Sequence, residues 1–186
     1  GGELVADMKY SSGDQDFTAQ LTELISKKPD IVFMPAYFAE GAIIMKQARE
    51  LGATFVLMGG DAMDNPDTVK IAGKAAEGFM QTAFPYDMTM KDMNDQAKAF
   101  TEAWKKNFPN KDATLGYTCY DMIIDALKRA GKADREAVTK ALAETKGLAT
   151  PVGIMTLNAN HDAEIPVGIL KYENGKRIYL GEIVPE

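Results

Sequence analysis

The chain has 186 residues, a net charge of −6 and a sequence pI near 4.9, enough length for one compact domain or two small ones. The acidic balance argues against a nucleic acid partner, which usually meets a basic face. No apolar run approaches the length of a membrane span, and a single cysteine, Cys119, allows no internal disulfide. We interpret Cys119 as a small core residue on a helix.

The first part of the chain alternates between strand and helix patterns. Apolar residues recur at helical spacing in the two longer segments, and the short apolar runs between them have strand length. A continuous apolar strand such as Ile31–Met34 is expected where helices cover both faces of a sheet. The predicted elements are a strand over 3–10, a helix over 16–28, a strand over 31–34, a helix over 39–51, a strand over 55–58, a short helix over 67–72 and a strand over 78–83.

The pattern changes after Pro85, where three helices with apolar faces follow one another between residues 92 and 146. Their faces are marked by Ala97 and Trp104, by Tyr117 and Leu127, and by Val138. Helices must bury such faces against another layer, and little adjacent strand sequence is available here. The tail returns to strands over 152–157, 167–172 and 177–183, with Asn174-Gly175 predicting a hairpin between the last two.

Two polar side chains follow the ends of two predicted parallel strands. Tyr37 lies just past Ile31–Met34, and Asp61 lies just past the strand over 55–58. Ligands of parallel α/β sheets sit in the crevice outside the carboxyl ends of the strands, so both side chains are expected to face one small-molecule site. Two alternatives stay open: Asp61 could cap or turn the chain before Asn65-Pro66, and Tyr37 could simply cover a strand end.

The collinear segments GDQDF, KPDIVFMPAYFAEGAIIMKQARELG, GGDAMDNP and AAEGF, followed by DREAVTKAL and a late NGK, make the chain similar to a known family. They resemble the periplasmic branched-chain amino acid-binding proteins of ABC transporters, over essentially all of the chain. The resemblance implies an α/β fold of the type I periplasmic-binding-protein class, with two flavodoxin-like lobes that close on an amino acid by a hinge. It also implies a permease partner, a periplasmic or membrane-tethered extracellular location, and no catalytic role.

The same resemblance assigns roles to individual residues. Asp61 would accept hydrogen bonds from the α-ammonium group of the ligand, and Tyr37 would hold the same end; the family often has glutamate where this chain has Asp61. Phe38 and Met63 would line the pocket for the ligand side chain, with plain packing as an equal alternative. The ligand would be an amino acid, with an aliphatic one favoured.

The resemblance also divides the chain. Residues 1–84 correspond to most of the second lobe, residues 85–155 to a later part of the first lobe, and residues 156–186 to a return to the second lobe. In the flavodoxin-like strand order a central strand would lie between Glu3–Tyr10 and Ile31–Met34, and this chain does not contain it. We therefore expect an incomplete fold whose sheet is completed by a missing N-terminal segment or by a second copy.

The residues leave other functions open. A regulatory ligand sensor of the same fold is the main alternative, and a flavodoxin-like enzyme domain is a third. Catalysis would have to use His161, the only histidine, which lies in a polar turn without a nucleophile motif nearby. Gly59-Gly60 lacks the spacing of a phosphate loop and is interpreted as a tight strand exit.

The sequence contains no convincing set of metal ligands. The pairs Asp14 and Asp16, and Asp61 and Asp64, match no calcium loop, and one histidine with one cysteine does not suit zinc. Met88, Met90 and Met93 could attract Cu(I), but methionines are spread through the chain and adaptable packing explains them better. We expect no metal and no cofactor.

Overall fold

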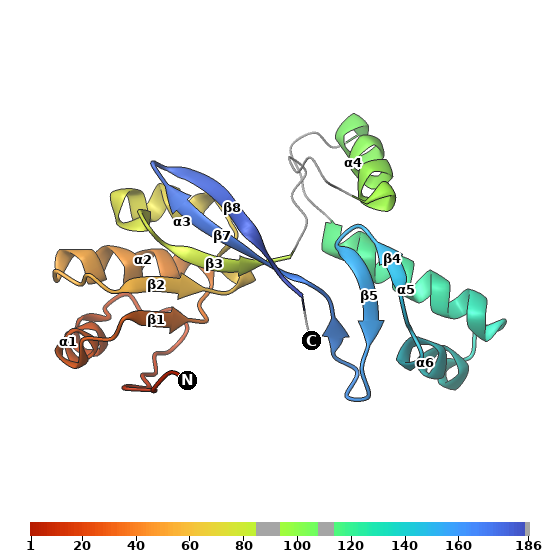
Figure 1. The fold of residues 1–186 in the computed structure, drawn as a ribbon, viewed down its shortest axis with the longest axis horizontal. Helices are drawn as coiled ribbons and strands as arrows, with labels where there is room; N and C mark the ends of the chain where they lie inside the picture. Colours follow the sequence, from red (N-terminus) through yellow and green to blue (C-terminus); the bar gives the residue numbers. More distant parts are fainter. Residues whose placement is uncertain (85–93, 108–113, 185–186) are drawn as a thin grey trace. The chain divides into compact units, whose positions relative to one another are not determined.

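The computed structural model describes residues 1–84, 94–107 and 114–184. The chain forms two compact units, each described here by itself. Unit 1 consists of Gly1–Ala83 and Gly168–Gly181, and unit 2 consists of Phe84–Val167 and Glu182–Glu186. Figure 1 shows the elements of both units in chain order.

Unit 1 is built on a five-stranded sheet with the order β1-β2-β3-β7-β8. The first three strands are parallel, and β3 pairs antiparallel with β7. The strands are β1 (Ile31–Met34), β2 (Val56–Gly59), β3 (Met80–Ala83), β7 (Val167–Glu173) and β8 (Lys176–Ile183). Five of the predicted strands, those over 31–34, 55–58, 78–83, 167–172 and 177–183, and the α/β class are therefore confirmed. The hairpin is confirmed too: Asn174 and Gly175 adopt positive φ values of 53° and 71° between β7 and β8.

One helix precedes β1, and the other helices of unit 1 connect β1 to β2 and β2 to β3 (Figure 1). They are α1 (Thr18–Lys27), α2 (Phe38–Glu50), the short 3₁₀ helix η1 (Asp61–Met63), α3 (Pro66–Ala72) and the 3₁₀ helix η2 (Gly73–Ala76). Their apolar residues meet one face of the sheet in a single cluster that includes Leu21, Met45, Leu57 and Phe79. The ring of Phe79 stacks on Tyr172 of β7 with centroids 5.8 Å apart, which joins the hairpin to this core.

The expected strand over 3–10 is not formed. Residues 1–10 have no regular secondary structure, and β1, which would need a neighbour between itself and that segment, pairs only with β2 in the part of the chain the structure describes. A strand requires a partner for its backbone hydrogen bonds, and none is available here. The segment is instead held near α1, where Tyr10 packs edge-on against Phe17 with centroids 5.4 Å apart.

The prediction that helices cover both faces of the sheet at Ile31–Met34 is also wrong. Ile31 and Phe33 of β1 are 50% and 58% exposed, because the described helices cover only the opposite face, where Met34 is buried. The apolar run that predicts a strand buried on both faces therefore lies on an edge strand with one open face.

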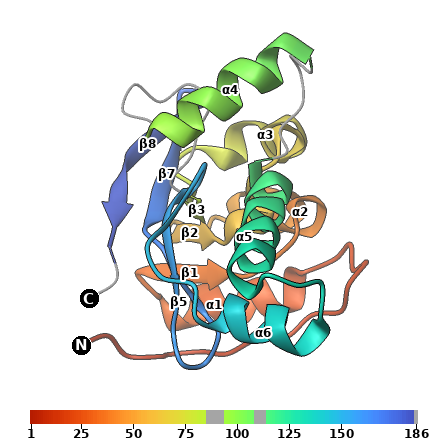
Figure 2. The ribbon, with the colours of Figure 1, turned by 90° about the vertical axis from the view of Figure 1, so that its right-hand side faces the viewer.

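Over residues 84, 94–107 and 114–167, which the structure describes, unit 2 forms three helices and a small antiparallel sheet. The elements are α4 (Asp95–Asn107), α5 (Thr114–Ala130), α6 (Arg135–Ala143), β4 (Leu148–Thr150), β5 (Gly153–Leu157) and β6 (Ala163–Glu164). The three predicted helices are confirmed, and α5 and α6 lie side by side (Figure 2). β4 and β6 were not predicted, since each has three residues or fewer.

The core of unit 2 is small among the described residues. Val152, Met155 and Ile165 form its buried cluster, with Phe84 and Met122 packed against it. The second segment of unit 1 begins at Gly168, and the pairing of β5 with β4 and β6 keeps residues 153–164 in unit 2.

Candidate functional site

The carboxyl ends of β1 and β2 meet at one edge of the sheet of unit 1. The two strands are parallel, and their last paired residues are Met34 and Gly59. Tyr37 follows this pair by three residues and Asp61 by two, so both leave the sheet at the same edge. The arrangement of the two strand ends that the sequence predicts is confirmed.

Tyr37 occupies the N-cap position of α2, with an extended backbone at φ −76° and ψ 160°. Its carbonyl oxygen accepts the N–H of Gly41 at 2.9 Å and thereby starts the helix. The side chain is 71% exposed, so it does not cover the strand end. A phenol in this position is accessible to a ligand and can both donate and accept a hydrogen bond.

Asp61 is the first residue of η1 and is exposed. The helix that follows is capped by Asn65, whose Oδ1 accepts the N–H of Asp67 at 2.8 Å. Asp61 therefore does not serve as the cap of α3, which removes that alternative. Within residues 1–84, 94–107 and 114–184 its carboxylate makes no hydrogen bond or ion pair, so both oxygens can accept from a ligand.

The nearby acid Glu40 differs from Asp61 because its carboxylate already has partners. Its Oε1 accepts the N–H of Gly13 at 3.1 Å and the hydroxyl of Ser12 at 3.5 Å. Hydrogen bonds from its own backbone N–H and from that of Gly13 hold the pKa of the Glu40 carboxyl below its ordinary value. Glu40 thus connects the turn before α1 to the start of α2, whereas the Asp61 carboxylate has no partner among the described residues and can bind a ligand.

The two expected pocket residues, Phe38 and Met63, differ in their burial. Phe38 is the first residue of α2 and is half-buried, next to Tyr37. Met63 is completely buried, which favours the packing alternative for this residue. A Cβ at Gly41 would lie 2.3 Å from its sulfur, and a Cβ at Gly59 would lie 2.8 Å from its Cγ. Met63 fills the space that these two glycines leave open.

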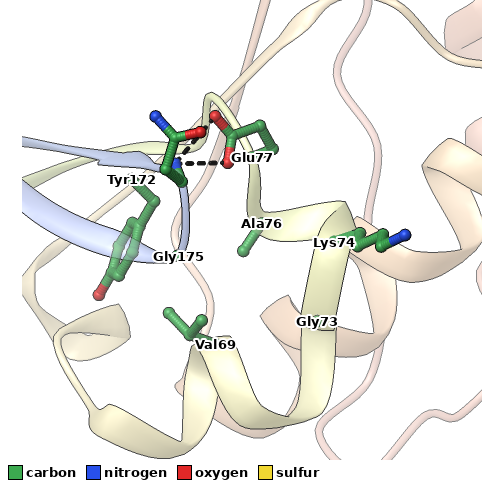
Figure 3. A pocket seen from close by; sticks show the side chains of 8 residues that line it. Val69, Gly73, Lys74, Ala76, Glu77, Tyr172 and Gly175 are labelled. Carbon is green, nitrogen blue, oxygen red and sulfur yellow. Dashed lines mark hydrogen bonds between the residues drawn. The ribbon is translucent and has the colours of Figure 1, made fainter.

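A hollow of about 490 Å³ lies elsewhere in unit 1, between α3, η2 and the β7–β8 turn (Figure 3). Its lining includes Val69, Ala76 and Tyr172 and is mainly apolar. Glu77 accepts the N–H of Asn174 at 2.9 Å, so its carboxylate is used by the fold. The hollow is not bordered by Tyr37 or Asp61, and no charged side chain directed into it offers a site for an amino acid.

Several other sequence-based candidates serve the fold. Cys119 is exposed on α5, so its assignment to the core is wrong: it lies on a helix face that the described residues leave open. His161 lies in the expected polar turn and is itself the residue with positive φ, at 67°. Asp14 and Asp16 accept backbone N–H groups from Ser11 and Thr18, at 2.7 and 2.9 Å.

Asp64 is paired with Arg177 of β8. It therefore does not join Asp61 as a free pair of carboxylates. Met88, Met90 and Met93 lie outside the described residues. No group of three or more histidine, cysteine, aspartate or glutamate side chains suited to a metal occurs in the described part of the chain.

One residue near the site was missed by the sequence interpretation. Gln81 of β3 is fully buried, and both polar atoms of its amide lack a hydrogen-bond partner among the described residues. The available signal was a glutamine inside the strand run over 78–83, where an apolar residue is expected.

A family model described as periplasmic binding protein matches residues 1–177, and the chain belongs to this family. Leu/Ile/Val-binding protein homolog 3 of Brucella melitensis is 31% identical over 185 residues, which covers 95% of this chain and 49% of that protein. The leucine-, isoleucine-, valine-, threonine- and alanine-binding protein of Pseudomonas aeruginosa is 30% identical over 82% of this chain and 40% of its own length.

Solved structures of amino acid-binding proteins superpose on this chain. The leucine-binding protein LivK of Thermotoga maritima superposes with a TM-score of 0.85 and 35% identity, over 95% of this chain and 51% of that one. LivJ of Streptococcus pneumoniae, solved with isoleucine, gives a TM-score of 0.80 and 27% identity, over 99% of this chain and 53% of that one. The fold is that of type I periplasmic binding proteins, and the chain spans about half the length of these relatives. None of its described helices has the length and apolarity needed to cross a bilayer.

Proposed function

We propose that the protein containing this chain binds an aliphatic amino acid and delivers it to the permease of an ABC transporter, without catalysis. The observation that carries the proposal is the exposed Asp61 carboxylate, which has no partner in the described chain and lies at the same sheet edge as Tyr37. A free carboxylate suits an α-ammonium group, and a phenol beside it suits a second hydrogen bond to the same end of the ligand.

The remaining roles follow from this geometry. Phe38, half-buried beside Tyr37, contributes apolar surface to the pocket. Unit 1 corresponds to the second lobe of the family fold and unit 2 to part of the first lobe. Relatives named for binding leucine, isoleucine and valine, and an isoleucine-bound structure neighbour, support an aliphatic side chain on the ligand. Family membership supports a periplasmic location.

We further propose that the sheet of unit 1 is completed by another segment of the protein or by a second copy. The support is the open face of β1, where Ile31 and Phe33 are exposed, together with its unpaired edge in the described chain. An exposed apolar edge strand is unstable against pairing with another strand, and proteins normally cover it.

The test is calorimetric titration of the full-length protein with L-leucine, L-isoleucine and L-valine, before and after the substitution Asp61→Asn. Asn keeps the shape and removes the charge, and hydrogen bonds to charged groups contribute about 1.5–3 kcal/mol, so affinity is expected to fall about 10- to 150-fold. Asp67→Asn is the matched control, because the Asp67 side chain is half-exposed on the following helix and pairs with Lys70.

Equal affinity of Asp61→Asn and the parent protein would refute the assigned site. Binding of an uncharged amide in place of the three amino acids would refute the ligand class and favour a sensor of the same fold. Tyr37→Phe tests the second group: removing one neutral hydrogen bond should weaken leucine binding about 2- to 10-fold.

A further inference from the structure

Gln81 lies on the central strand of the unit 1 sheet, and its side-chain amide has no hydrogen-bond partner among the described residues. It belongs to β3, is 0% exposed, and neither its Nε2 nor its Oε1 has a hydrogen-bond partner in the described chain. A buried amide that stays unpaired destabilises a fold, and an apolar residue of similar size would be the better choice there. A group of this kind therefore needs a partner in some state of the protein.

The register places Gln81 beneath the candidate site. Gln81 pairs with Gly59, the last residue of β2, and Asp61 follows two residues later. Paired residues of neighbouring strands point to the same face, and a Cβ at Gly59 would lie 2.8 Å from Met63 Cγ and 3.0 Å from Phe79 Cζ. The side chain of Gln81 thus lies on the face covered by η1, the short helix that Asp61 begins.

The two ends of η1 are held differently. Its last residue is fixed, because the Met63 carbonyl accepts the Thr68 hydroxyl and the Asn65 N–H, each at 2.8 Å. At its beginning, the N–H groups of Asp61 and Ala62 have no acceptor inside the helix, as in the first turn of any helix. The exposed start of η1 and the buried Gln81 amide, which has no partner among the described residues, therefore belong to adjoining parts of the fold.

We propose that Gln81 is a positioning residue for Asp61. When Asp61 binds the ammonium group of the ligand, η1 moves closer to β3. The Gln81 amide then forms hydrogen bonds with the η1 backbone that are absent in the ligand-free protein. Only interactions that differ between two states shift the equilibrium between them, so these bonds favour the bound state. The inference rests on the proposed function and adds a residue that does not touch the ligand.

The test uses the full-length protein with Gln81→Met, which keeps the length of the side chain and removes its polar atoms. The ligand-free variant should unfold at a temperature equal to or above that of the parent, while its affinity for L-leucine falls about 10-fold. Gain of stability with loss of affinity is the expected signature, since a residue that only packs would change both in the same direction or neither. Thr82→Val, the next residue on β3 but facing the other side, is the matched control and should leave leucine affinity unchanged.

Two results would overturn the inference. One is unchanged leucine affinity in a folded Gln81→Met variant. The other is a ligand-free variant less stable than the parent with the same affinity, which would mean that buried water already satisfies the amide. A second measurement needs no folded variant: the side-chain ¹⁵N–¹H resonances of Gln81 in the parent protein should shift and become protected from exchange when L-leucine is added. Resonances that stay unchanged at saturation would also overturn it.

The same experiments separate this inference from the proposed function. If Asp61→Asn abolishes leucine binding and Gln81→Met does not alter it, only the role of Gln81 fails. If the parent protein does not bind leucine, isoleucine or valine, the proposed function fails and the role of Gln81 fails with it.

Discussion

Units 1 and 2 are both assembled from amphipathic helices and short strands, yet they bury these helices in different ways. In unit 1, α1, α2 and α3 pack on a sheet, and residues such as Met45, Leu57 and Phe79 are completely buried. In unit 2, α5 leaves Leu115, Tyr120 and Ile123 exposed, although its sequence is as clearly amphipathic. Periodicity is enough to form a helix, but a layer to pack on decides whether its apolar face becomes a core.

The first prediction tests this difference in the two cores. Phe79→Ala in unit 1 should lower the free energy of unfolding by about 3–5 kcal/mol, because Phe79 is completely buried and stacks on Tyr172. Val152→Ala in unit 2 should cost only about 2 kcal/mol, since Val152 is smaller and belongs to a smaller cluster. Urea unfolding followed by circular dichroism measures both. Equal losses would show that the two cores are of comparable strength.

The second prediction compares two arginines that hold backbone carbonyls. Arg49 donates to the carbonyls of Ala53 and Phe55 in unit 1, at 2.8 and 3.1 Å. Arg129 donates to the carbonyl of Ala141 and the hydroxyl of Thr145 in unit 2. Replacement of either by Met should cost about 2 kcal/mol after allowance for partial exposure, measured by urea unfolding.

A control separates these hydrogen bonds from the ion pair that Arg129 makes with Asp125. Asp125→Asn should cost less than about 1 kcal/mol, because the pair is about one-third exposed. A larger loss for Asp125→Asn than for Arg129→Met would contradict the assignment.

The third prediction compares two helical glycines. Gly116→Ala on α5 should raise stability by about 0.5–1 kcal/mol, because the new Cβ meets nothing within 4 Å. Gly41→Ala on α2 should lower it by about 1–2 kcal/mol, because Met63 has to move. Thermal unfolding of the two variants measures the difference. Met63→Ala should make Gly41→Ala favourable in the double variant, and failure of that rescue would exclude Met63 as the cause.

The smallest expected effect is a pH dependence confined to unit 1. The pKa of Glu40 is held below its ordinary value of 4.5, mainly by its own backbone N–H and then by that of Gly13. A lowered pKa stabilises the fold above about 4.5, and the contribution is lost as the pH falls through the lowered pKa. Glu40→Gln should therefore reduce the loss of stability between pH 5 and pH 3, measured by thermal unfolding across that range. An unchanged pH profile would count against this role of the turn.

Much of unit 1 was predictable because its elements are specified locally. The helices and strands between residues 16 and 83 follow from periodicity, and the juxtaposition of Tyr37 and Asp61 follows from the rule that parallel strands share one carboxyl edge. The predictions that failed are those that depend on contacts with other segments of the chain. The segment 3–10 has a strand pattern but no strand to pair with, and Cys119 lies on an apolar helix face that the described chain does not cover.

Met63 and Gln81 show a second limit of the sequence. Met63 follows a strand pattern and Gln81 lies within one, but whether each side chain is buried depends on the side of the sheet that η1 covers. That side is set by the path of the chain after Gly59, and no local pattern encodes it.

The sequence by itself determined the family, the α/β class, the strand ends that carry Tyr37 and Asp61, and the Asn174-Gly175 turn. These depend on periodicity, turn chemistry and collinear motifs, which act over a few residues. Only the tertiary structure showed that Asn65, and not Asp61, caps α3, and that Met63 fills the space above two glycines. It also showed that Gln81 is buried without a hydrogen-bond partner among the residues described. Each of these outcomes depends on which atoms from distant segments meet, and that is decided by packing.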